Sequence, residues 1–170
     1  PEKWKESGFR DFLSIEWLAW VPLLSLTLVL GLFPRLVLGM TDAFSIPWKL
    51  RGMDAFLVDL LDNPGFVKRV IALVVDYNCR LVQHAAEIGV DIVRLTDDYA
   101  FNSGPFMSPD MWVEFIQPGL RQIVETAHGA GLKVVKHCCG NLAGLAEPIL
   151  DTGVDGTHPE ESKLIQNLLR

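Results

Sequence analysis

The 170-residue chain contains few cysteines and lacks any cluster of lysine and arginine residues. Its formal net charge is −6, the opposite sign to that of a surface that follows nucleic-acid phosphates. The cysteines, Cys79, Cys138 and Cys139, are too few and too unevenly placed for a disulfide scaffold. We therefore expect a protein of the reducing cytoplasm that does not bind nucleic acid.

A glycine-rich phosphate loop is also missing, because no strand-like segment is followed by Gly-x-Gly-x-x-Gly. This absence disfavours an open sheet that binds a nucleotide. Hydrophobic residues make up 49% of the chain and charged residues 21%, which is typical of a globular protein with a substantial core.

One long apolar run stands out. Residues 17–34, "WLAWVPLLSLTLVLGLFP", carry no charge and come close to the minimum length of a membrane span. Pro22, Ser25 and Thr27 interrupt the run. We favour a helix packed against a sheet over a membrane helix, and expect no membrane span.

Short apolar segments that end in polar residues alternate with segments of helical periodicity. The apolar segments, near 35–42, 90–98, 132–139 and 153–157, predict strands. The segments between them, 52–89, 108–131 and 142–153, predict helices, with breaks at Asn63-Pro64-Gly65 and at Pro118. Alternating strands and helices predict a parallel sheet covered by helices.

Two architectures fit this alternation, a doubly wound open sheet and a (β/α)8 barrel. Four strands are about half of such a barrel. The sequence begins at Pro1 and its last ten residues continue an amphipathic pattern, so we expect a piece of a longer chain. We predict an α/β fold of the TIM-barrel type, with about half of the barrel in a single partial domain over residues 1–170.

The functional face of either architecture lies at the carboxyl ends of its strands. Acids, imidazoles and thiols stand at all four predicted ends, where any one of them could also cap a turn. These residues are Asp42, Asp97, Asp98, His137, Cys139, His158 and Glu160.

The sequence "KHCCG" at 136–140 is the strongest indication of a functional site in the chain. Side chains alternate along a strand, so His137 and Cys139 share one face while Lys136 and Cys138 share the other. If His137 points into a barrel, Cys138 faces the layer of helices. Imidazole and thiolate are ligands that zinc prefers, but two ligands alone do not make a zinc site. The alternative interpretation is a hydrogen-bonded core histidine beside a small buried thiol.

Residues 35–160 resemble the uroporphyrinogen decarboxylase superfamily, and are most similar to its branch of cobalamin-dependent, zinc-containing methyltransferases that act with coenzyme M. Four motifs carry the resemblance. They are Asp97-Asp98, the Gly-Pro-x-x-Ser-Pro-Asp of 104–110, the Ala-His-x-x-Gly-x-x-Val of 127–134 and the His-x-Cys-Gly of 137–140.

The resemblance implies a (β/α)8 barrel whose mouth holds the substrate, with His137 and Cys139 as zinc ligands. A cysteine farther along the chain would supply a third ligand; none follows Cys139 here, so this cysteine is either beyond Arg170 or absent, and its absence would exclude the zinc site that the resemblance implies. We predict that Asp97 and Asp98 are catalytic, orienting His137 or binding substrate. Contacts with the substrate are predicted for Asp42, Phe101 and Glu160.

The activity implied is methyl transfer between a corrinoid (cobalamin) and a zinc-activated thiol. Expected partners are a small-molecule thiol or tetrapyrrole substrate and a corrinoid protein, and the resemblance suggests a homodimer. Two alternatives stay open. One is the decarboxylation of an acidic tetrapyrrole, as in porphyrin biosynthesis, with catalytic residues upstream of Pro1; the other is a non-catalytic corrinoid or tetrapyrrole carrier.

Overall fold

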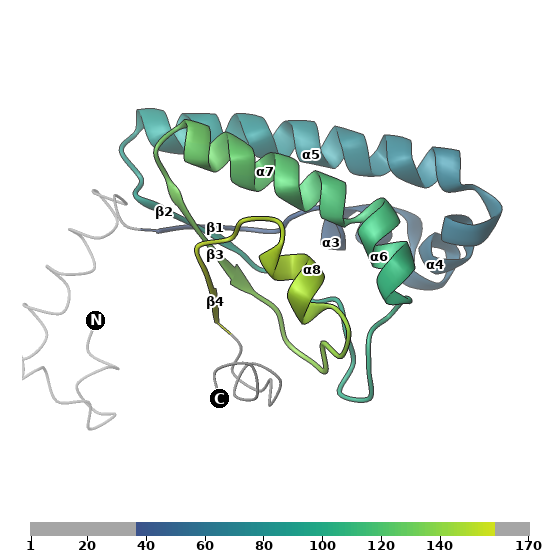
Figure 1. Cartoon of the computed structure of the whole chain (residues 1–170). Helices are drawn as coiled ribbons and strands as arrows, with labels where there is room; N and C mark the ends of the chain where they lie inside the picture. The colour runs from purple at the N-terminus through teal and green to yellow at the C-terminus, as the bar shows by residue number, and fades with distance from the viewer. Residues whose placement is uncertain (1–36, 159–170) are drawn as a thin grey trace, which may run out of the picture. The chain divides into compact units, whose positions relative to one another are not determined.

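A computed structural model describes residues 37–158, which belong to one compact unit spanning Leu36–Arg170 (Figure 1). The apolar run at 17–34 and Glu160 lie outside the described residues. The elements in chain order are β1 (Val37–Met40), α3 (Ser45–Arg51), α4 (Met53–Asp62), α5 (Pro64–Glu87), β2 (Ile92–Leu95), α6 (Pro109–Phe115), α7 (Gln117–Gly129), β3 (Lys133–His137), α8 (Ala146–Leu150) and β4 (Gly156–His158).

The four strands form one parallel sheet in the order β1-β2-β3-β4. Each strand pairs with the next along the chain, and a helix lies in every connection. This sequential order belongs to the (β/α)8 barrel, whereas a doubly wound sheet reverses its strand order at a switch point. The predicted α/β fold of barrel type is confirmed, with four of the eight strands in the described residues.

The predicted breaks between helices are also confirmed. Asn63 separates α4 from α5, and Pro64 takes the first turn of α5. The Ser108 side chain caps α6 by accepting the Met111 N–H at 3.3 Å. The helical segment around Pro118 divides into α6 and α7. Within 37–158, none of the helices combines the length and apolar character that crossing a bilayer requires.

Helices cover one face of the sheet (Figure 1). The side chains that β2 and β3 turn toward them are buried: Val93, Leu95, Val134 and Lys136. α5 and α7 lie side by side, and Gly119 permits their close approach, since a Cβ there would lie 2.7 Å from Val75 Cγ2.

Residues on the opposite face of the sheet are less buried. Arg94 on β2 and Gly39 on β1 are exposed, while Val135 and His137 on β3 are half-buried. In a (β/α)8 barrel this face lines the interior, and the carboxyl ends of its strands surround the barrel mouth. His137 therefore stands where the fold places functional residues.

Candidate metal centre

Three potential metal ligands converge at the carboxyl ends of β2 and β3. Asp98, His137 and Cys139 each offer one ligand atom, and these atoms all lie within 4.8 Å of one another. Cys139 Sγ is 3.2 Å from His137 Nε2. The shared face predicted for His137 and Cys139 is confirmed, and the structure adds a carboxylate to the pair.

Strand pairing and one hydrogen bond bring Asp98 to this position. The β2–β3 register ends at Leu95 opposite Lys136, so the residues that follow on both strands continue side by side. The backbone N–H of Cys139 donates to Asp98 Oδ1 at 2.7 Å. A carboxylate has several lone pairs, so Asp98 keeps the capacity to bind a cation while it is held against Cys139.

Gly140 allows the two chain segments to touch directly after the ligands. Its φ is +91°, and a Cβ would lie 2.5 Å from the carbonyl oxygen of Ala100. Next to it, the N–H of Asn141 donates to the Phe101 carbonyl oxygen at 2.8 Å. Any larger residue at 140 would push the Cys139 segment away from the loop after β2.

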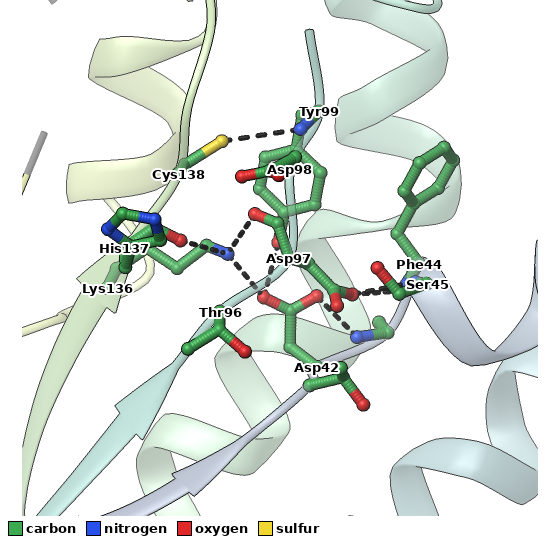
Figure 2. A network of polar contacts seen from close by, with 12 residues as sticks. Asp42, Phe44, Ser45, Thr96, Asp97, Asp98, Tyr99, Lys136, His137 and Cys138 are labelled. Atoms are coloured by element: carbon green, nitrogen blue, oxygen red, sulfur yellow. Dashed lines mark hydrogen bonds and ion pairs between the residues drawn. The ribbon is translucent and has the colours of Figure 1, made fainter. Parts of the chain in front are cut away.

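Behind these ligands, on the helix-covered side, lies a buried network of polar side chains (Figure 2). The Lys136 side chain is 1% exposed and pairs with the fully buried Asp42 at 2.8 Å. Its ammonium also donates to the carbonyl oxygens of Asp97 at 2.7 Å and His137 at 3.1 Å. The Tyr99 hydroxyl donates to Asp42 at 2.6 Å. Every charge in this network has a partner, as burial requires.

Asp97 completes the network in its protonated form. Burial, reinforced by the charge of Asp42, raises the pKa of Asp97 to about 8. One of its oxygens accepts the N–H groups of Phe44 and Ser45 at 2.8 Å each, while the other is buried without a donor. The Asp97 and Asp42 side chains also hydrogen-bond to each other, and the pKa of Asp42 is lowered because the charge of Lys136 and the hydrogen bonds from Asp97, Lys136 and Tyr99 outweigh its burial.

The predicted site residues thus fall into two groups. Asp98, His137 and Cys139 are brought together, while Asp97 and Asp42 lie in the buried network, and the roles predicted for these two stay predictions. Phe101 is 60% exposed, its ring centroid lies 4.3 Å from that of Phe106, and its carbonyl oxygen adjoins Gly140. Glu160 lies beyond the described residues.

Cys138 is buried on the helix side, as the strand alternation predicted. It accepts the Tyr99 N–H at 3.3 Å, and burial raises the pKa of its thiol to about 12. At neutral pH this sulfur remains a thiol, which neither attacks nor binds metals well.

Sequence reasoning missed Lys136 and Tyr99 as members of the network. A signal was present: Lys136 alternates with Val134 and Cys138 on the face predicted to meet the helices. A lysine at such a position needs a buried anion, and Asp42, at the end of the first predicted strand, was available.

Comparison with known proteins agrees with the fold. The family model for uroporphyrinogen decarboxylase (URO-D) matches residues 39–170. A solved structure of a methyltransferase from Methanosarcina mazei is similar, with a TM-score of 0.63 and 20% sequence identity. The match covers 71% of this chain and 34% of that one, so the chain spans about a third of the neighbour's length. At this identity the likeness shows the fold alone. No curated protein matches the sequence.

Proposed function

Because the chain belongs to the uroporphyrinogen decarboxylase (URO-D) family, we propose that it is part of a methyltransferase of that family in which Asp98, His137 and Cys139 bind zinc. The convergence of these three ligand atoms is the observation that carries the proposal. The methyltransferase from Methanosarcina mazei, which has a similar fold, supports the choice of reaction.

The ligand set fits zinc. Nitrogen, sulfur and oxygen ligands are all common for this ion, and bonds of about 2.0–2.3 Å place tetrahedral ligand atoms roughly 3.3–3.8 Å apart. The 3.2 Å between Cys139 Sγ and His137 Nε2, and the 4.8 Å limit on all three atoms, agree with such a set. Three protein ligands with one open position is the composition of catalytic zinc sites. A cysteine beyond Arg170 would replace Asp98 as the third ligand and leave that position open for the substrate.

When bound, zinc would hold a substrate thiol as its nucleophilic thiolate at neutral pH. The protein's own residues set up this chemistry. Cys139 must bind as a thiolate and His137 as a neutral imidazole. Asp98, fixed by the Cys139 N–H, adds a second negative charge that favours the cation. We propose that the methyl group comes from a corrinoid and is received by a small-molecule thiol.

Phe101 supplies an apolar surface next to these ligands. Its ring is exposed although its backbone contacts the Cys139–Gly140 turn. A flat, largely apolar macrocycle such as a corrinoid or tetrapyrrole matches an exposed aromatic ring. We propose contact with substrate at Phe101, a corrinoid protein as partner, a homodimer, and a cytoplasmic location in keeping with the cysteine content.

Decarboxylation of an acidic substrate is a second candidate, favoured by Arg94. This arginine is exposed on the less buried face of the sheet, in register with Val135 and next to Gly39 on β1. An added Cβ on Gly39 would have no atom within 4 Å, so the space beside Arg94 is open among the described residues. A guanidinium in that position suits a substrate carboxylate.

Zinc content distinguishes these candidates. The wild-type chain should hold about one zinc per chain, and His137→Ala should lose it together with methyl transfer to a thiol. The matched control is His84→Ala, which removes an exposed α5 histidine paired with Glu87 and should keep the metal. Wild-type protein without zinc would refute the proposal. Carbon dioxide release from a tetrapyrrole acid that is unchanged in His137→Ala would favour the second candidate.

A further inference from the structure

Lys136, in the buried network, contacts the two chain segments that carry the metal ligands. We infer that Lys136 is a positioning residue for the metal centre: its ammonium ties the end of β2 to the end of β3 and so sets how close Asp98 lies to His137 and Cys139. This inference rests on the proposed function, since it concerns the same ligands. The ammonium of Lys136 donates to backbone carbonyl oxygens and pairs with Asp42, so it acts on the ligands through the backbone.

The ammonium of Lys136 links the end of β2 to the end of β3. Regular β2–β3 pairing ends at Leu95 and Lys136, before any of the ligands is reached. Beyond that point Lys136 donates to the carbonyl oxygen of Asp97, the residue directly before Asp98, and to that of His137. One cation thus joins the backbone of both ligand-bearing segments where strand hydrogen bonds have stopped.

The ammonium is itself held in place from several sides. Asp42, at the end of β1, pairs with it at 2.8 Å and is fixed in turn by the Ala43 N–H and the Tyr99 hydroxyl, each at 2.6 Å. The ring of Tyr99 lies below the ammonium, 4.3 Å from centroid to Nζ. A buried lysine with this many partners has little freedom to move, so it can define a distance between two strands.

Two further contacts join the same segments and depend on that distance. Tyr99 N–H donates to Cys138 Sγ at 3.3 Å, and Cys139 N–H donates to Asp98 Oδ1 at 2.7 Å. If the strand ends separated, both would lengthen, and Asp98 would leave the reach of a metal bound by His137 and Cys139. Positioning through such contacts typically contributes about 10- to 100-fold to metal affinity.

A purely structural role for Lys136 predicts something different, and the two can be separated. The double variant Lys136→Met/Asp42→Asn removes both charges together. Replacing a buried ion pair by uncharged groups of similar size often leaves stability unchanged or improved. The donors to the Asp97 and His137 carbonyl oxygens are nevertheless lost. If Lys136 acts only through stability, zinc affinity should be unaffected in a double variant that folds normally.

The experiment measures the zinc dissociation constant of the full chain by chelator competition, and the visible spectrum of bound Co²⁺. We expect the double variant to bind zinc about 10- to 100-fold more weakly and to show an altered Co²⁺ spectrum. The control is Lys133→Met on the same strand, whose lysine is 69% exposed and pairs with Asp155 at 2.8 Å. It should retain both wild-type values.

Wild-type affinity and spectrum in a folded double variant would overturn the inference while leaving the proposed function intact. Failure of the wild-type chain to bind zinc would instead refute the proposed function, and the inference with it. Should the double variant not fold, Tyr99→Phe provides the test, because it deletes only the hydroxyl that fixes Asp42. It should weaken zinc binding severalfold, and unchanged affinity in this variant would contradict the role of the network.

Discussion

The two faces at the ends of β2 and β3 carry similar residues, but one face is buried and the other is accessible. Three neighbouring pairs, Asp97-Asp98, Lys136-His137 and Cys138-Cys139, each send one member into the buried network and the other to the metal centre. Strand alternation, and not residue chemistry, decides which member goes where. Two adjacent cysteines or aspartates therefore lie in different environments and have different roles.

Burial explains why only one face suits metal chemistry. On the covered side it raises the pKa of Cys138 to about 12 and that of Asp97 to about 8, so both hold their protons at neutral pH. On the other side Cys139 is exposed and lies against His137 and Asp98. The covered face stabilises and positions, and the open face is available to a ligand.

The largest expected difference between the two faces is in folding stability, which the loss of Lys136 should lower much more than the loss of His137. Lys136→Met leaves the Asp42 charge buried without its cation, and breaking such a pair typically costs about 3–5 kcal/mol. His137→Ala on the open face should cost less than about 1 kcal/mol without metal, because its side chain is half-buried. Urea denaturation of metal-free protein measures both. Equal losses would contradict the division of roles.

The protonated state of Asp97 should appear as a pH dependence of stability. Its pKa is about 8 in the folded protein and near 3.9 in the unfolded chain. Between these values the folded state binds more protons, so stability should fall as pH rises from about 4 to about 8. Asp42 opposes this trend only at the acid end: its pKa is lowered in the folded protein, so above about pH 5 it is ionised in both the folded and the unfolded state.

Asp97→Asn is the variant that tests this dependence. The amide keeps an oxygen for the Phe44 and Ser45 N–H groups and presents a donor to Asp42. We expect the stability of the variant not to decline with pH, and to exceed that of wild type at pH 8 by a few kcal/mol, with about four pH units of titration at about 1.4 kcal/mol each as the upper limit. Denaturation series at pH 5 and pH 8 provide the measurement. A variant less stable than wild type at pH 8 would show that Asp97 is ionised.

Gly140, at the boundary between the two faces, should show a smaller effect on stability. Gly140→Ala adds a Cβ at positive φ and 2.5 Å from the Ala100 oxygen, which should cost about 1–2 kcal/mol and weaken zinc binding by moving Cys139. Gly39→Ala is the matched control, because a Cβ there meets no atom within 4 Å. Equal behaviour of the two variants in denaturation and zinc titration would show that the Gly140 contact does not matter.

Local patterns were enough to predict the parallel sheet, the helix breaks and the shared face of His137 and Cys139. They were not enough to rank Asp97 against Asp98, because both follow the same strand and only the tertiary fold shows that Asp98 meets Cys139. Lys136 was overlooked for a related reason: its partner Asp42 lies 94 positions earlier in the chain, a pairing that no local period encodes.

X-ray absorption at the zinc edge of the zinc-loaded chain tests the central claim most directly. The metal should have one sulfur neighbour at about 2.3 Å and nitrogen or oxygen neighbours at about 2.0–2.2 Å. The sulfur signal should vanish in Cys139→Ser and persist in Cys138→Ser. A spectrum that lacks sulfur, or one whose sulfur depends on Cys138, would contradict the assignment of the open face as the metal centre.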